Sequence, residues 1–239
     1  MPQDVRDLPV AADGPSRWKI LAEFVLFGAM FLSDRWIQAI TTISWGRVEI
    51  SLTNLHSNPP CLAIIAVLLL WLNGGLGSLN FEWPANWRRC LWQLAVVLVV
   101  AFLATEIFAR VSHALWGTAP EANAIKTMIG HPQVRYLFAF LIFPIWAVVE
   151  EVLYRAYFLQ RIEWLARPWR YALPLAMLIS SAIFAMRHLN YGVQEFPYYV
   201  FAGMMFSAIF LYTKRSIWFV SVIHYLKNTA LLVWLNLAG

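Results

Sequence analysis

The chain has 239 residues, of which 61% are hydrophobic and 13% charged, and its mean hydropathy is +0.61. This composition is too apolar and too poor in charge for a water-soluble globular domain, so it predicts a polytopic membrane protein. The formal net charge of +5 is spread over short loops with no basic run longer than two residues, which argues against nucleic-acid binding.

The first sixteen residues form the first predicted region of the chain. Residues 1–16 are polar, interrupted by Pro and Gly, and lack periodicity, so we expect a flexible cytoplasmic tail. They do not resemble a secretory signal peptide, because the first apolar run, Trp18 to Leu32, is followed by Ser-Asp-Arg-Trp rather than a small-residue cleavage site.

Seven apolar runs approach the roughly 17 to 25 residues that a helix needs to cross a bilayer. They lie near 18–33, 61–79, 90–109, 136–160, 171–188, 197–213 and 217–236. Asn73-Gly74-Gly75 interrupts the second run, so its helix is expected to end early. Residues 36–58, between the first two runs, are of mixed polarity and could form an interfacial helix or a short hairpin. The predicted fold class is an all-α transmembrane bundle of about seven spans.

The charges in the loops predict how the bundle is oriented. Lys and Arg are more frequent in the segments that share a side with the N-terminus, which favours a cytoplasmic N-terminus and an external C-terminus. Arg is commoner than Lys, a weak indication of a GC-rich bacterial genome and hence of a bacterial inner membrane. Cys61 and Cys90 fall near opposite membrane faces, so we expect no disulfide between them.

A charged segment follows directly on the fourth apolar run. Glu150-Glu151-Val152-Leu153-Tyr154-Arg155 comes after the run Tyr136 to Val149. A charge at membrane depth costs about 2.5–3.5 kcal/mol on insertion scales, so such groups usually face a protein interior and have a function there. Glu151 and Arg155 are four apart and share a helix face, whereas Glu150 is turned about 100° away. We therefore expect Arg155 to neutralise Glu151 in a supporting role, leaving Glu150 available for chemistry.

Three further polar residues occur in the apolar second half of the chain. His188 ends the fifth run, and His224 and Asn228 lie four apart in the seventh. From the helical rise, all of them and Glu150 are expected about 12 to 24 Å from the inner end of their helices. Glu150 could take a proton from water, His188 could position that water, and His224 with Asn228 could stabilise an oxyanion. Individually, His188 could be an interfacial residue, and His224 and Asn228 could form interhelical hydrogen bonds.

Taken in order, three motifs resemble a known family. They are E-E-x-x-x-R at Glu150, Glu151 and Arg155, F-x-x-x-H at Phe184 and His188, and H-x-x-x-N at His224 and Asn228. This order resembles the CPBP family, the CAAX prenyl endopeptidases and bacteriocin-processing intramembrane proteases. The similarity covers roughly residues 136–236, a CPBP-like catalytic core, whereas 17–135 holds N-terminal transmembrane helices and loops without a matching signature.

The resemblance implies a glutamic intramembrane endopeptidase with no cofactor and no metal. In it Glu150 is the water-activating base, His188 assists, and His224 and Asn228 form the oxyanion site, in a cavity between spans 4, 5 and 7. Tyr154 and Ala156 stand where the family often has Phe and Gly. The implied partner is a membrane-associated peptide, such as a leader or a C-terminal sorting segment, in the lipid bilayer.

Two other functions remain open from the sequence. Glutamates and histidines can bind Zn²⁺, which would make the chain a membrane metalloprotease, although no H-E-x-x-H occurs. The chain could also be a non-catalytic immunity or adaptor protein that binds a peptide. Two further features are of interest: Glu106 and Arg110 form a predicted structural pair, and Lys227 could partner either Glu195 or a substrate carboxylate.

Overall fold

The computed structural model describes residues 15–33, 42–45, 48–51, 59–73, 76–81, 85–117, 136–189 and 192–237. Most of the predicted N-terminal tail lies outside these residues. The chain separates into two compact units, Met1–Leu76 and Gly77–Gly239. The candidate functional residues all belong to the second unit.

The described residues of the first unit form two helices and a pair of strands. Helix α1 spans Arg17–Ser33 and helix α2 spans Pro59–Leu72. Strands β1 (Thr42–Trp45) and β2 (Val48–Ser51) pair antiparallel between them, so the hairpin is the alternative that the structure supports. Helix α2 ends at Leu72, directly before the predicted interruption. There the Asn73 amide donates to the Glu23 carboxylate at 2.9 Å.

The described residues of the second unit form helices joined by turns and short loops. After η3 (Leu76–Leu79), which crosses the boundary between the units, the second unit comprises α3 (Trp87–Trp116), η4 (Phe138–Ile142), α6 (Phe143–Glu151), η5 (Val152–Leu159), α7 (Gln160–Ala166), α8 (Ala172–Met186), the short η7 (Val193–Glu195), α9 (Phe196–Tyr212) and α10 (Ile217–Leu237). Each of the predicted apolar runs therefore contains a helix. The boundary residues between η4 and α7 all have right-handed helical backbone, so these four elements form one continuous helix.

A long π-helical stretch follows the two glutamates. All eight residues of η5 are buried. π-helix usually occurs as single-turn bulges, frequently at functional sites. A π turn holds more residues than an α turn, so this stretch changes which residues after Glu151 face the neighbouring helices.

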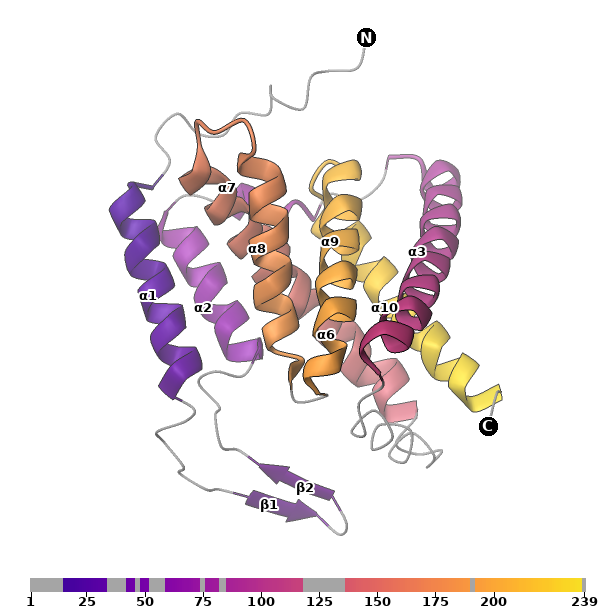
Figure 1. Ribbon diagram of the computed structural model, residues 1–239. Helices are drawn as coiled ribbons and strands as arrows, with labels where there is room; N and C mark the ends of the chain where they lie inside the picture. The colour runs from indigo at the N-terminus through magenta and orange to yellow at the C-terminus, as the bar shows by residue number, and fades with distance from the viewer. Residues whose placement is uncertain are drawn as a thin grey trace. The chain divides into compact units, whose positions relative to one another are not determined.

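Helices α8 and α9 pack closely against each other and against η5 (Figure 1). A Cβ atom added at Gly203 would lie 2.8 Å from the Ser181 Cβ, so only glycine fits at this crossing. The Ser180 hydroxyl donates to the Tyr154 carbonyl at 2.7 Å and ties α8 to η5. Helix α10 packs on α6 and α3, and Trp87 meets Trp218 edge to face at 5.9 Å. Together these contacts place η5, α8, α9 and α10 around one buried region.

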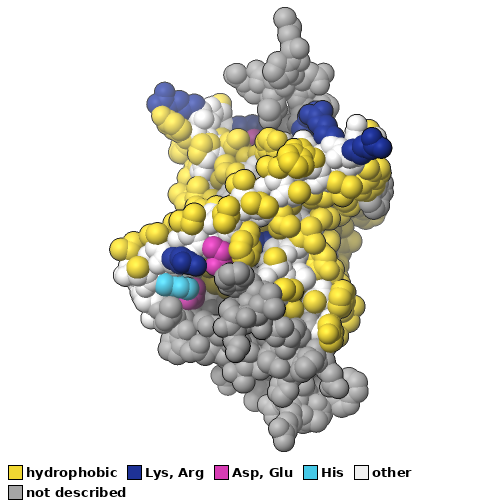
Figure 2. Space-filling view, turned by 90° about the vertical axis from the view of Figure 1, so that its right-hand side faces the viewer, with side chains coloured by type: hydrophobic (Ala, Val, Ile, Leu, Met, Phe, Trp, Pro, Cys, Tyr) yellow, Lys and Arg dark blue, Asp and Glu magenta, His cyan; other side chains and the backbone are white. Residues whose placement is uncertain are grey.

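The outer face of α3 is strongly apolar. Figure 2 shows the side of the molecule on which α3 lies in Figure 1, and hydrophobic side chains cover much of the described surface there. The exposed large hydrophobic side chains of α3 are Trp87, Leu91, Trp92, Val96, Val99, Val100, Leu103, Ile107, Val111, Leu115 and Trp116. Among the described residues, this helix is the one that is long and apolar enough to cross a membrane, and α2 and α8 are shorter apolar helices.

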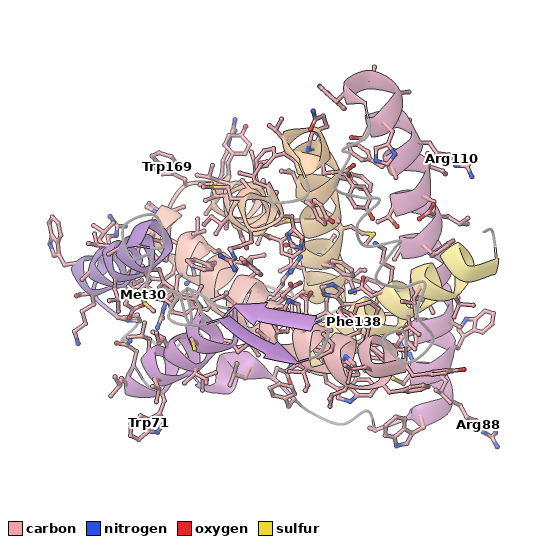
Figure 3. All side chains as sticks on the ribbon, turned by 90° about the horizontal axis from the view of Figure 1, so that it is seen from below. Met30, Trp71, Arg88, Arg110, Phe138 and Trp169 are labelled. Atoms are coloured by element: carbon pink, nitrogen blue, oxygen red, sulfur yellow. The ribbon has the colours of Figure 1, made fainter. Side chains whose placement is uncertain are left out.

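One predicted pair on α3 is not formed. No ion pair joins Glu106 and Arg110, although both residues are described. Figure 3 shows Arg110 pointing away from the neighbouring helices, as Arg88 does at the other end of α3. Exposed ion pairs gain little free energy and restrict two long side chains, so helical spacing alone does not ensure contact.

Candidate active site

Glu151 and Arg155 form the centre of the site. Both side chains are fully buried, and Arg155 Nε lies 3.2 Å from Glu151 Oε2 across one turn, which is the predicted contact. Arg155 also donates to the Gly203 carbonyl at 3.0 Å. Its guanidinium lies 5.2 Å from the Phe184 ring and 5.4 Å from the Phe206 ring. This cation is thereby fixed by a carboxylate, a carbonyl and two aromatic rings contributed by α6, α9 and α8.

His224 on α10 contacts both glutamates of α6. Its Nδ1 lies 2.7 Å from Glu151 Oε1, and its Nε2 lies 3.7 Å from Glu150 Oε2. An ionised carboxylate only accepts hydrogen bonds, so Nδ1 carries the proton that Glu151 accepts. Phe206 stacks on the imidazole at 4.4 Å between ring centroids. The ring orientation is therefore set, and Nε2 faces Glu150.

Glu150 differs from Glu151 in its partners. It is 6% exposed, against 0% for Glu151, and its shortest recorded contact is the 3.7 Å approach of His224. That separation is longer than a direct hydrogen bond. Glu150 is thus the carboxylate of the pair whose oxygens are not committed to a short contact with Arg155 or His224.

His188 lies just after the end of α8 and is oriented by two neighbours. Its Nδ1 donates to the Phe184 carbonyl at 2.9 Å, because a carbonyl can only accept, so Nε2 is the basic nitrogen. The ring stacks on Tyr199 at 4.0 Å and lies 4.5 Å from the Phe184 ring. Since Phe184 also packs on Arg155, His188 is connected to the glutamates through an aromatic ring.

Asn228 lies one turn after His224 on α10 and is half-buried. The structure therefore brings Glu150, Glu151, Arg155 and His224 into contact, whereas His188 and Asn228 lie around this group without a recorded bond to Glu150.

Sequence reasoning missed the bond between Glu151 and His224. It assigned Glu151 to Arg155 alone, but the carboxylate also orients the imidazole. It also missed the aromatic side chains of α9, Tyr199 and Phe206, which stack on the two histidines. The sixth apolar run is rich in aromatic residues, which indicates that rings could pack near the site. Composition alone does not predict which ring stacks on which histidine.

The described residues contain no group of three or more His, Cys, Asp or Glu side chains arranged to hold a metal ion. In the cluster of Glu150, Glu151 and His224, the Nδ1 atom of the imidazole is already bonded to a carboxylate. These three side chains therefore do not fit a metal centre.

The comparisons with known proteins agree with the motifs. Residues 132–230 match the family model described as type II CAAX prenyl endopeptidase Rce1-like, and this confirms the resemblance predicted from the sequence. Proteins of this family are membrane proteases, so residues 132–230 resemble part of a membrane protease. No curated protein and no solved structure matched the chain.

Proposed function

We propose that the chain is a glutamate-dependent intramembrane endopeptidase that hydrolyses a peptide bond of a membrane-associated peptide. The observation that supports it best is the buried set of Glu150, His224, Glu151 and Arg155, in which one carboxylate is held by a cation and the other lies beside an oriented imidazole. An ion pair that only stabilised the fold would need Glu151 and Arg155 but not Glu150. A base beside a fixed imidazole is an arrangement that hydrolysis uses.

In the proposed reaction Glu150 removes a proton from water, and the resulting hydroxide attacks the peptide carbonyl carbon. Negative charge then develops on the carbonyl oxygen, where His224 and Asn228 donate hydrogen bonds. Because His224 Nδ1 already donates to Glu151, donation from Nε2 requires an imidazole protonated on both nitrogens. Once Glu150 has taken the proton from water, the oxyanion balances that positive charge, while Arg155 balances the charge of Glu151.

The intermediate collapses when the carbon–nitrogen bond breaks. The proton taken by Glu150 is passed to the leaving amine, and His188 assists by positioning water or relaying this proton. The immediate products are a carboxylic acid and an amine, which ionise to a carboxylate and an ammonium group, so atoms and charge balance without a cofactor. Glu151 and Arg155 act by holding His224 and the helix in place.

The proposed setting is a bundle of seven spans in a bacterial inner membrane, with the N-terminus in the cytoplasm. The site then lies between the fourth, fifth and seventh spans, which are the η4–α7 helix, α8 and α10. Residues 17–135 supply additional spans, and 136–236 form the catalytic core. The substrate is a leader or a C-terminal segment that enters from the bilayer.

The test is cleavage of a membrane-peptide library by purified protein in detergent. Glu150→Gln is compared with the parent chain, with and without a strong chelator. Removing a general base should lower the rate about 10²- to 10⁴-fold. Glu163→Gln is the matched control, because Glu163 is a partly buried glutamate that pairs with Arg215 at 2.8 Å, away from the proposed base.

If the parent chain cleaves in chelator and only Glu150→Gln is inactive, the proposal is supported. Equal cleavage by Glu150→Gln and the parent chain rejects Glu150 as the base. Loss of cleavage in chelator, restored by added zinc, would instead identify a metalloprotease.

A further inference from the structure

Lys227 is a buried cation next to the proposed oxyanion site. It lies on α10 between His224 and Asn228, and it is 5% exposed. Placing an ammonium group away from water is unfavourable unless its charge is paired. A charge in this position therefore needs a partner.

The partners that the structure gives Lys227 are neutral. Its Nζ donates to the Tyr198 hydroxyl at 2.9 Å and lies 5.5 Å from the centre of the same ring. Within the described part of the chain, no carboxylate forms an ion pair with it. Glu195, which the sequence offered as a partner, instead pairs with His113 at 3.2 Å. The charge of Lys227 is thus solvated by an aromatic hydroxyl and a ring but not balanced.

We propose that Lys227 is a specificity-determining residue that binds the terminal carboxylate of the peptide substrate. This inference rests on the proposed function. Lys227 lies three residues after His224, which is about 4.5 Å along the helix axis. One or two extended peptide residues span that distance. A substrate whose scissile carbonyl lies at His224 can therefore place its terminal carboxylate at Lys227 when its C-terminus follows one or two residues later.

A terminal carboxylate suits this position better than an acidic side chain does. Any peptide that ends in the site carries one, whereas a bilayer-embedded segment has few ionised side chains. The ammonium group balances the carboxylate charge, and the Tyr198 hydroxyl can donate a second hydrogen bond to it. A lipid phosphate presents the same anionic oxygen chemistry, so the experiment has to separate the two sources.

The test measures binding rather than cleavage, in the Glu150→Gln background. The probe is a library of ten-residue peptides with apolar last residues, each made once with a free carboxylate and once as the carboxamide. We expect the best-binding sequences to bind about 10- to 100-fold more tightly as the carboxylate. Lys227→Met should bring this ratio close to one, Lys227→Arg should keep most of it, and Lys214→Met, an exposed lysine on the α9–α10 turn, should leave it unchanged.

Three results overturn the inference: Lys227→Met keeps the ratio, the background protein shows no carboxylate preference, or no peptide binds. A Lys227-dependent competition by anionic phospholipid without a carboxylate preference also overturns it, and identifies a lipid site. If Lys227→Met does not fold, Lys227→Gln takes its place. Binding is measured without turnover, so the two proposals can fail separately. If peptides bind more tightly as the carboxylate but the parent chain cleaves nothing, only the protease proposal is rejected. If the parent chain cleaves but shows no preference for the carboxylate, only the role of Lys227 is rejected.

Discussion

Glu151 accepts contacts from two sides, at 3.2 Å from Arg155 and 2.7 Å from His224, whereas Glu150 meets His224 at 3.7 Å. A buried carboxylate with two such partners contributes to the fold, because removing it leaves a buried cation unpaired. A buried carboxylate without a short contact to a cation costs free energy and is retained for another reason. The two neighbouring residues should therefore respond differently to neutralisation.

We expect Glu151→Gln to lower the free energy of unfolding by about 3–5 kcal/mol, the range for removing one partner of a buried ion pair. Glu150→Gln should leave stability unchanged or raise it, because it removes a charge next to Glu151. Thermal unfolding of both variants and Glu163→Gln in the same detergent measures this. Equal destabilisation by Glu150→Gln and Glu151→Gln would contradict the division of roles.

The local part of the site could be predicted from sequence. Glu151 and Arg155 share a helix face, so their spacing predicted the ion pair that is observed. The bond between Glu151 and His224 joins residues 73 apart, and it depends on how α10 packs on α6. Spacing within a motif carries no information about that packing. The same limit applies to Lys227, because its position in the sequence does not exclude Glu195 as a partner, whereas in the folded chain Glu195 pairs with His113.

At the scale of elements, Arg155 depends on how closely α9 approaches α8. Its guanidinium donates to the Gly203 carbonyl at 3.0 Å, and Gly203 directly faces Ser181. A side chain at residue 203 would separate the two helices and move this carbonyl. The packing of α8 and α9 therefore supports the position of Glu151 as well.

Gly203→Ala tests this coupling. The added Cβ would lie 2.8 Å from the Ser181 Cβ and 3.0 Å from the Ser181 Cα, which is backbone and cannot rotate away. Overpacking of this kind typically costs about 1–3 kcal/mol, and here activity should fall together with stability. Stability and peptide cleavage are measured side by side for each variant.

The control is Gly28→Ala in α1, where an added Cβ meets nothing within 4 Å. Replacing a helical glycine with space around it should be neutral or stabilising by up to about 1 kcal/mol. Ser181→Gly, combined with Gly203→Ala, removes two of the three close contacts and should restore part of the loss. If Gly203→Ala is as harmless as Gly28→Ala, the close crossing is not required.

The helices themselves were largely predictable, because runs of apolar residues long enough to cross a bilayer have few alternatives to helix. The end of α2 before Asn73 was predicted from the Asn-Gly-Gly sequence, which does not continue a helix well. The π stretch of η5 was not predicted. Its residues have the same types as those of an α-helix, and the register change depends on the neighbours that bury all eight of them.

At the scale of the whole molecule, composition predicts a membrane protein, and the apolar outer face of α3 agrees with contact with lipid. Side chains that face lipid cannot be separated from side chains that face a partner protein by hydropathy alone. The number of spans and their direction therefore stay predictions that rest on run length and on the distribution of Lys and Arg. Both are open to direct measurement.

The predicted topology places the two ends of α9 on opposite sides of the membrane. In a chain whose Cys61 and Cys90 have been replaced by Ser, a single cysteine is introduced at Val193, which is 69% exposed, or at the exposed Lys214. With a cytoplasmic N-terminus and seven spans, Lys214→Cys should react with a membrane-impermeant maleimide only after the cells are opened. Val193→Cys should react in intact cells whose outer membrane has been made permeable. Reversal of both results means that the N-terminus is outside or that an earlier run does not span, and labelling of both positions from one side means that α9 does not cross the bilayer.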